Sequence, residues 1–176
     1  MAQTRDASAG GKPAPLVVSR QFAAPRELVF EAWSTAGHMK RWFSPEHLTV
    51  PEAEIDFRPG GACVICMRSP EGENFWSRGT FVEVAPPDRL VFSSDVTIAD
   101  ARRFSVLTTV TFEADGAGTR MTVRQDYEIH DDAFRDAIAG ATEGWRTTLD
   151  KLEAEVARTV ASVARSAVHA TLGDRV

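Results

Sequence analysis

The sequence predicts an α+β protein in which a curved seven-stranded antiparallel sheet wraps around one long C-terminal helix. Two observations lead to this fold class. Six strand-like segments separated by turn residues lie between residues 49 and 129, a spacing typical of an antiparallel meander. Apolar residues then recur at helical spacing from residue 134 onward. A helix with a continuous apolar stripe must bury it, and the sheet is the only large partner available.

The N-terminal part predicts one strand and two short helices. Residues 1–15 are rich in Ala, Gly, Ser and Pro and are expected to form a flexible lead-in. The segment 16–22 (LVVSRQF) predicts the first strand. Pro25 suits the first turn of a helix, and the apolar residues that share one face of this helix are Leu28, Val29, Ala32 and Trp33. A second short helix is expected over about 38–43, ending before Ser44-Pro45.

Six further strands follow, each bounded by turn residues such as Pro59-Gly60-Gly61 and Asp115-Gly116. The predicted ranges are 49–57, 62–68, 74–85, 89–96, 103–114 and 119–129.

The long helix is predicted to begin at Asp131-Asp132, because acidic residues suit the positive end of a helix. Its apolar stripe consists of Phe134, Ile138, Ala141, Trp145, Leu149, Leu152 and Val156. Residues 16–156 are therefore expected to form the domain, and 157–176 either a helix extension or a frayed tail. Because an apolar strip on a surface helix needs a cover, a homodimer contact beyond Val156 is a further hypothesis.

Composition excludes several classes of protein. The net charge of −5 argues against nucleic-acid binding through a broad basic face. No run of about 18 apolar residues predicts a transmembrane helix. The N-terminus has no apolar core typical of a secretory signal, and the two cysteines predict no disulfide framework. We therefore expect a cytoplasmic protein.

The two cysteines form a C-x-x-C spacing, Cys63 and Cys66, within an apolar segment that predicts a strand. Residues three apart in a strand point to opposite faces. No helix start is predicted at this point to lower a thiol pKa, and no second cysteine or histidine pair completes a zinc site. These cysteines are expected to pack in or beside the sheet, and no metal or cofactor is predicted.

Polar residues on the predicted inner faces of two strands are candidates for a binding site. Thr108 shares a face with Phe112, and Gln125 shares one with Tyr127. If these faces meet the long helix, the polar groups need partners. A small ligand could supply them, and the alternative is that water or backbone groups do so. The aromatic residues expected to line the same space are Trp33, Trp42, Phe43, Trp76, Phe112, Tyr127 and Trp145, with core packing as the alternative.

Candidates for acid–base catalysis are few. The histidines at 38, 47, 130 and 169 show no metal-ligand spacing. Glu52, Glu54 and Asp56 alternate with apolar residues, which places them on a solvated face. No nucleophile elbow or phosphate-binding loop is present. We predict no catalytic residue.

Four collinear stretches resemble a known family. They are FAAPRELVFEAWSTAGHMKRWF (22–43), AEIDFRPGGACVICMRSPEGE (53–73), GTFVEVAPPDRLVFS (79–93) and EGWRTTLDKLEAEV (143–156). With the element order, they resemble the helix-grip fold of the START-like superfamily, which includes polyketide cyclase/dehydrase-like and lipid-transfer proteins. More narrowly, they resemble the small bacterial form of the activator of heat-shock-protein-90 ATPase C-terminal-domain-like family.

The resemblance implies an internal, mostly apolar cavity and no fixed catalytic set. The expected function is the binding of a small hydrophobic molecule. One alternative is a cyclase- or hydrolase-like enzyme that uses Tyr127, Gln125 or His38 to move a proton. The other is a chaperone-linked protein-interaction module, although the resemblance reaches only the second domain of the eukaryotic co-chaperone.

Overall fold

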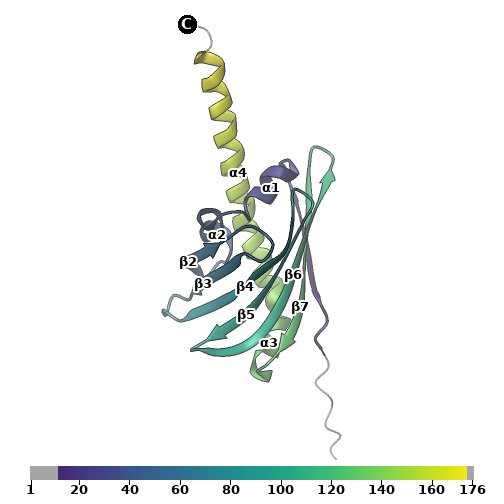
Figure 1. Cartoon of the computed structure of the whole chain (residues 1–176), viewed down its shortest axis with the longest axis vertical. Coiled ribbons are helices and arrows are strands. Elements are labelled where there is room, and N and C mark those ends of the chain that lie inside the picture. The colour runs from purple at the N-terminus through teal and green to yellow at the C-terminus, as the bar shows by residue number, and fades with distance from the viewer. Residues whose placement is uncertain (1–11, 174–176) are drawn as a thin grey trace, which may run out of the picture.

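A seven-stranded antiparallel sheet and one long helix dominate the computed structural model, which describes residues 12–173 (Figure 1). The strand order is β1-β7-β6-β5-β4-β3-β2, and every neighbouring pair is antiparallel. This arrangement confirms the predicted fold class. Residues 1–11 of the expected flexible lead-in lie outside the described residues. No helix among residues 12–173 is long and apolar enough to cross a membrane.

The elements follow the predicted order closely. Their bounds are β1 (Leu16–Phe22), α1 (Arg26–Glu31), α2 (Ala36–Trp42), β2 (Thr49–Ile55), β3 (Ala62–Arg68), β4 (Asn74–Ala85), β5 (Arg89–Ile98), β6 (Ala101–Asp115), β7 (Gly118–Ile129), η1 (Asp132–Phe134), α3 (Arg135–Ala139) and α4 (Ala141–Gly173).

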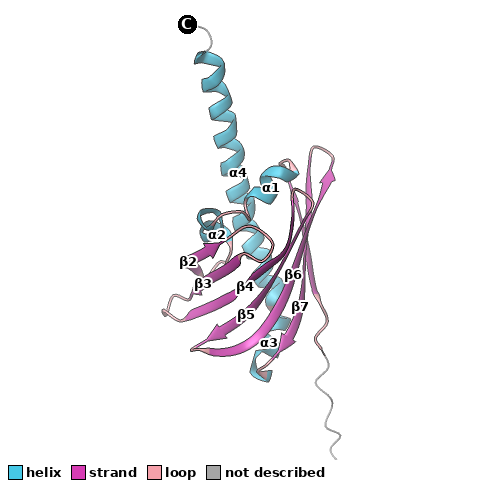
Figure 2. Cartoon of the chain, viewed as in Figure 1, coloured by secondary structure: helices cyan, strands magenta, loops and turns pink. Residues whose placement is uncertain are grey.

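The sheet curls around α4, which crosses its concave face (Figure 2). The register of the central strands is irregular between Phe81 and Glu83 on β4, and between Val96 and Thr97 on β5. Bulges of this kind increase local twist and bend a strand. The bends let the inner faces of several strands approach one helix, so the core lies between α4 and the concave face.

The long helix begins later than predicted. Asp131 caps the short helix η1 rather than α4, because its Oδ1 accepts a hydrogen bond from the backbone N–H of Ala133 at 3.1 Å. The chain then forms α3, which ends at Ala139, and the backbone N–H of the following Gly140 donates to Asp136 O at 3.0 Å. Glycine has a low helix propensity, and α4 starts one residue later. The single helix predicted to begin at Asp131-Asp132 is therefore divided into three elements, η1, α3 and α4.

The apolar stripe of α4 is buried over Trp145, Leu149, Leu152 and Val156. Beyond Val156 the helix continues to Gly173 and projects away from the sheet (Figure 1). Val160 still packs against the core, whereas Val163 is exposed. The homodimer contact on this part of α4 stays a prediction.

A buried carboxylate fixes α2 to α4. The side chain of Glu155 on α4 is 2 % exposed and lies 2.6 Å from His38 Nδ1. It also accepts hydrogen bonds from Arg41 at 2.6 Å and Arg158 at 2.8 Å. Charge-assisted hydrogen bonds of this length are among the stronger polar interactions in proteins. Because α2 leads directly into the loop at residues 43–48, this cluster also positions that loop.

The same partners set the ionisation of Glu155. Burial by itself would raise the pKa of this carboxyl. The hydrogen bonds from Arg41 and His38, with the positive charges of Arg41 and Arg158, outweigh burial, so the pKa lies below its ordinary value. A carboxyl with a lowered folded-state pKa contributes stability above its unfolded-state pKa and loses it as the pH falls through the folded-state pKa.

Replacing Glu155 by glutamine is expected to lower the free energy of unfolding by about 2 kcal/mol at neutral pH, because three cationic or polar partners lose a buried charge. The difference from the wild type should be constant above about pH 5 and shrink towards pH 3. Urea titrations across this range measure it. Glu153→Gln is the matched control, because the exposed Glu153 carboxylate accepts from Arg20 at 3.0 Å on the surface of α4. A difference for Glu155→Gln that does not change with pH would contradict this expectation.

Candidate functional site

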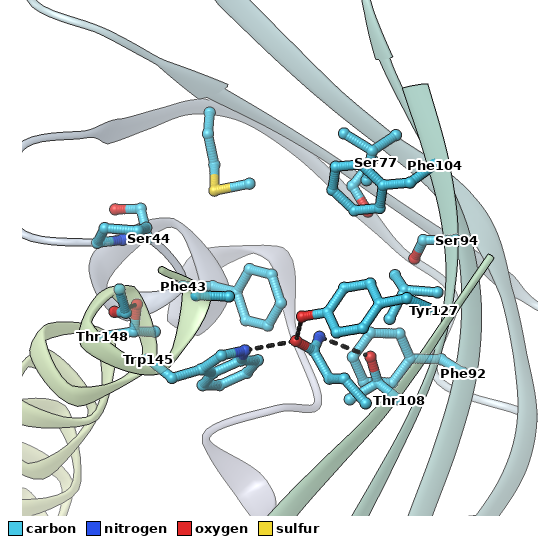
Figure 3. Close-up of a pocket in the computed structure, with 17 residues that line it drawn as sticks. Phe43, Ser44, Ser77, Phe92, Ser94, Phe104, Thr108, Tyr127, Trp145 and Thr148 are labelled. Atoms are coloured by element: carbon cyan, nitrogen blue, oxygen red, sulfur yellow. Dashed lines mark hydrogen bonds between the residues drawn. The ribbon is translucent and has the colours of Figure 1, made fainter. Parts of the chain in front are cut away.

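A cavity of about 230 Å³ lies between the concave face of the sheet and the first turns of α4 (Figure 3). Strands β3 to β7 form one wall, α4 forms the opposite wall, and the loop after α2 closes one side. The lining residues are Phe43, Ser44, Pro45, Met67, Ser77, Phe92, Ser94, Val96, Phe104, Val106, Thr108, Gln125, Tyr127, Ala141, Gly144, Trp145 and Thr148.

A hydrogen-bonded network of four side chains forms the polar part of the wall. Gln125 donates through Nε2 to Thr108 Oγ1 at 3.0 Å. Its Oε1 accepts from the Tyr127 hydroxyl and from Trp145 Nε1, the latter at 2.7 Å. Because an indole nitrogen can only donate, this contact fixes which end of the amide is the oxygen. The network joins β6, β7 and α4, as Figure 3 shows.

The strand register explains how the network forms. Thr108 and Gln125 are directly paired across β6 and β7, and such cross-strand neighbours lie within hydrogen-bonding reach. Tyr127 follows Gln125 by two residues, so both point to the same face. The sequence predicts that these polar groups need a ligand, water or backbone groups. They satisfy one another instead, with Trp145 as the fourth member.

Among the described residues that line the cavity, Tyr127 is the one with a titratable acidic side chain, the phenol hydroxyl. Burial raises the pKa of its hydroxyl further above the ordinary value. The hydroxyl is therefore protonated at neutral pH, and its hydrogen is directed to Gln125 Oε1.

The structure places five of the nine predicted site residues around the cavity. Phe43 comes from the loop after α2, and its ring centroid lies 5.9 Å from that of Trp145. The other four are Thr108, Gln125, Tyr127 and Trp145.

Three predicted lining residues lie in the core instead. Trp33 and Trp42 are fully buried with ring centroids 4.6 Å apart, and Trp42 Nε1 donates to the carbonyl of Ala32 at 2.8 Å. Phe112 packs against Phe30, with ring centroids 5.2 Å apart. None of the three is in the cavity lining. For these residues the alternative of core packing is the correct one.

Trp76 lies on the opposite face of the sheet, which corrects its expected place in the lining. Its neighbour Ser77 lines the cavity, and successive side chains of a strand point to opposite faces. The guanidinium carbon of Arg78 lies 4.2 Å from the centroid of the Trp76 ring. This cation–π contact covers the indole on the outer face.

Sequence reasoning missed Ser94 and its neighbours on β5. Phe92, Ser94 and Val96 all line the cavity, and they share a face with the buried Leu90. The period of two along β5 was a usable signal. The loop residues Ser44 and Pro45 carried no comparable signal, because a loop has no periodicity.

The cysteines lie as expected from their spacing. Cys63 is part of the hydrophobic core, whereas Cys66 is buried on the other face of β3, opposite Trp76 on β4. Burial raises the pKa of Cys63 to about 12 and also raises that of Cys66. Both are free thiols, and neither lines the cavity.

Other candidates for acid–base or metal chemistry lie away from the cavity. His38 contacts Glu155 and is outside the lining. Ser105 donates to Asp95 Oδ1 at 2.5 Å and lies 2.8 Å from His130 Nε2. Its hydrogen is therefore directed to a carboxylate rather than to a general base, unlike that of a catalytic serine. Within residues 12–173, no group of three or more His, Cys, Asp or Glu side chains is arranged to hold a metal ion.

Known proteins resemble this chain in sequence and fold. The family model described as "Activator of Hsp90 ATPase homolog 1-like protein" matches residues 23–157. No curated protein matches the chain. A crystal structure of a protein from Nitrosomonas europaea is 28% identical with a TM-score of 0.72, and the match covers 84% of this chain and 96% of that one.

A second solved structure carries the family's name. The crystal structure of the AHSA1 protein from Silicibacter pomeroyi is 29% identical with a TM-score of 0.69, and the match covers 83% of this chain and 99% of that one. Neither name states a ligand or a reaction. The residues that match the family model run from just after β1 into the middle of α4 and include every residue of the cavity lining. The chain therefore belongs to the family of Activator of Hsp90 ATPase homolog 1-like proteins, with the helix-grip arrangement of the START-like superfamily.

Proposed function

We propose that this protein binds one small, mostly apolar molecule in the cavity between α4 and the sheet. The observation that carries the proposal is the composition of the lining, in which aromatic and aliphatic side chains surround a few fixed polar groups. Sites for small molecules have this composition. The Gln125 amide is held by three hydrogen bonds, so it would not need to reorganise when a ligand enters.

The volume limits the size of the ligand. An apolar cavity of ~150 Å³ holds benzene, and drug-sized molecules use sites of ~300–1,000 Å³. At about 230 Å³, the cavity suits a single substituted ring or a short chain. A long-chain lipid or a sterol would require α4 or the loop at 43–48 to move.

Binding is favoured over catalysis by the chemistry of the lining. A general acid or base works best when its pKa lies near the operating pH. Tyr127, the titratable acid group in the wall, has its pKa shifted upward, away from neutrality. The other polar side chains of the wall are hydroxyls, the Gln125 amide and the Trp145 indole N–H, and none of these exchanges protons readily at neutral pH.

Native mass spectrometry of freshly purified protein tests the proposal. We expect a population heavier than the bare chain by the mass of one small organic molecule, which extraction and mass analysis then identify. The matched control is Trp145→Ala, which removes part of the α4 wall and should lose the adduct. An adduct that persists in Trp145→Ala would place the molecule elsewhere and overturn the proposal.

A further inference from the structure

Ser94 has a buried hydroxyl with no hydrogen-bond partner among the described residues. The residue is 3% exposed and lines the cavity from the sheet side, where Figure 3 shows its side chain extending away from β5. Its cross-strand neighbours are Gly79 on β4 and Val106 on β6. Neither neighbour has a side chain that can form a hydrogen bond with this hydroxyl.

A serine at this position lowers the stability of the folded protein relative to an alanine. A buried hydroxyl without a partner has lost its hydrogen bonds to water and gained none. Alanine would occupy almost the same space without that penalty. A partner that enters the cavity would remove the cost, and the hydroxyl can both donate to such a partner and accept from it.

The lining also restricts the charge of such a partner. Among the described residues, no Asp, Glu, Lys, Arg or His side chain lines the cavity. Lys151 stands beside it, but its ammonium group donates to Ser44 Oγ, Pro45 O and Leu48 O at 3.0, 2.8 and 3.1 Å. These three bonds use all three hydrogens. An ionised ligand would therefore lose its hydration without meeting an opposite charge.

We infer that the ligand is a neutral molecule with a hydroxyl or similar hydrogen-bonding group that binds Ser94 Oγ. This inference rests on the proposed function and adds the chemical class of the ligand and its anchoring residue. The aromatic rings of Phe92, Phe104 and Tyr127, which line the same cavity as Ser94, favour a ligand with an aromatic ring, because offset and edge-on ring pairs are favourable. A small phenol meets all of these conditions.

A matched pair of probes isolates the contribution of the hydroxyl group. p-Cresol and p-xylene have nearly the same shape and differ in one hydroxyl that replaces a methyl group. Their affinities are measured by titration for the wild type, for Ser94→Ala and for Ser93→Ala. Ser93 is the matched control, because it precedes Ser94 on β5 and faces the other side of the sheet.

We expect the affinity ratio of p-cresol to p-xylene to fall about fivefold in Ser94→Ala and to stay unchanged in Ser93→Ala. A change of about fivefold in affinity corresponds to the net contribution of one hydrogen bond to binding. 4-Methylbenzoate, which is charged, should not bind at concentrations at which p-cresol saturates the wild type. Ser94→Ala should be at least as stable to heat as the wild type, because it removes an unpaired group.

The outcomes separate this inference from the proposed function. If both probes bind but their ratio is the same in Ser94→Ala, the anchoring role of Ser94 is wrong and the binding cavity stands. If 4-methylbenzoate binds as tightly as p-cresol, the ligand class is wrong. If neither neutral probe binds at millimolar concentration, the proposed function fails, and the inference fails with it.

Discussion

Replacing Trp33 by alanine is expected to lower the free energy of unfolding by about 3–5 kcal/mol, the range for removing a large aromatic side chain from a core. The indole is fully buried. Its ring contacts Trp42, Phe43, Phe92 and Phe112 at centroid distances of 4.6 to 6.5 Å. Alanine would leave a void among these rings, which cannot collapse fully because α1, α2 and the sheet hold them. Urea denaturation measures the change.

Trp76→Ala is the matched control for this prediction. The same side chain is removed, but from the outer face, where the contact with Arg78 is half-exposed. We expect a loss of about 1 kcal/mol or less, the range for cation–π contacts at such sites. Equal losses for the two variants would contradict the assignment of Trp33 to the core and Trp76 to the outer face.

Replacing Gln125 by leucine is expected to lower the free energy of unfolding by about 3 kcal/mol, because two buried donors lose their partner. Leucine is similar in size, so the loss comes from hydrogen bonds rather than from volume. The Trp145 indole N–H and the Tyr127 hydroxyl would both lose their acceptor, and each unpaired buried group costs ~1–3 kcal/mol. Thermal and urea denaturation both report this change.

Gln21→Leu provides the control with the same chemistry. Gln21 is exposed on the edge strand β1 and donates to Asp115 Oδ2 at 2.7 Å. Water can replace this bond, so we expect a loss within about 0.5 kcal/mol. If Gln125→Leu is no more destabilising than Gln21→Leu, the network does not hold the cavity wall together.

The strands were predictable because two local signals coincide. Turn residues such as Gly60 and Gly116 adopt positive φ angles of 78° and 60°, which glycine tolerates best, and they separate segments with a period of two. The start of α4 was not predictable, because the apolar spacing of Phe134 and Ile138 runs through Gly140 without interruption. The break depends on how η1 and α3 pack, which the spacing does not record.

The cavity lining was predictable only in part, because the same residue types fill a core and line a cavity. Thr108 and Phe112 share one face of β6, yet Phe112 packs under α1 against Phe30, and Thr108 faces the cavity. Whether a residue on this face lies in the core or lines the cavity depends on which helix covers its position along the strand. Trp76 was misplaced for a different reason: Phe75 and Trp76 are both aromatic, so the pattern did not reveal which one faces inward.

The spectrum of the indole N–H groups on addition of p-cresol tests the central claim most directly. The chain has four tryptophans, and two-dimensional ¹H–¹⁵N spectra resolve one signal for each, assigned with single Trp→Phe variants. We expect saturable movement of the Trp145 signal, because its N–H lies in the cavity wall, and no movement of the Trp76 signal on the outer face. Movement of Trp76 alone, or of no signal at millimolar p-cresol, would contradict a ligand site between α4 and the sheet.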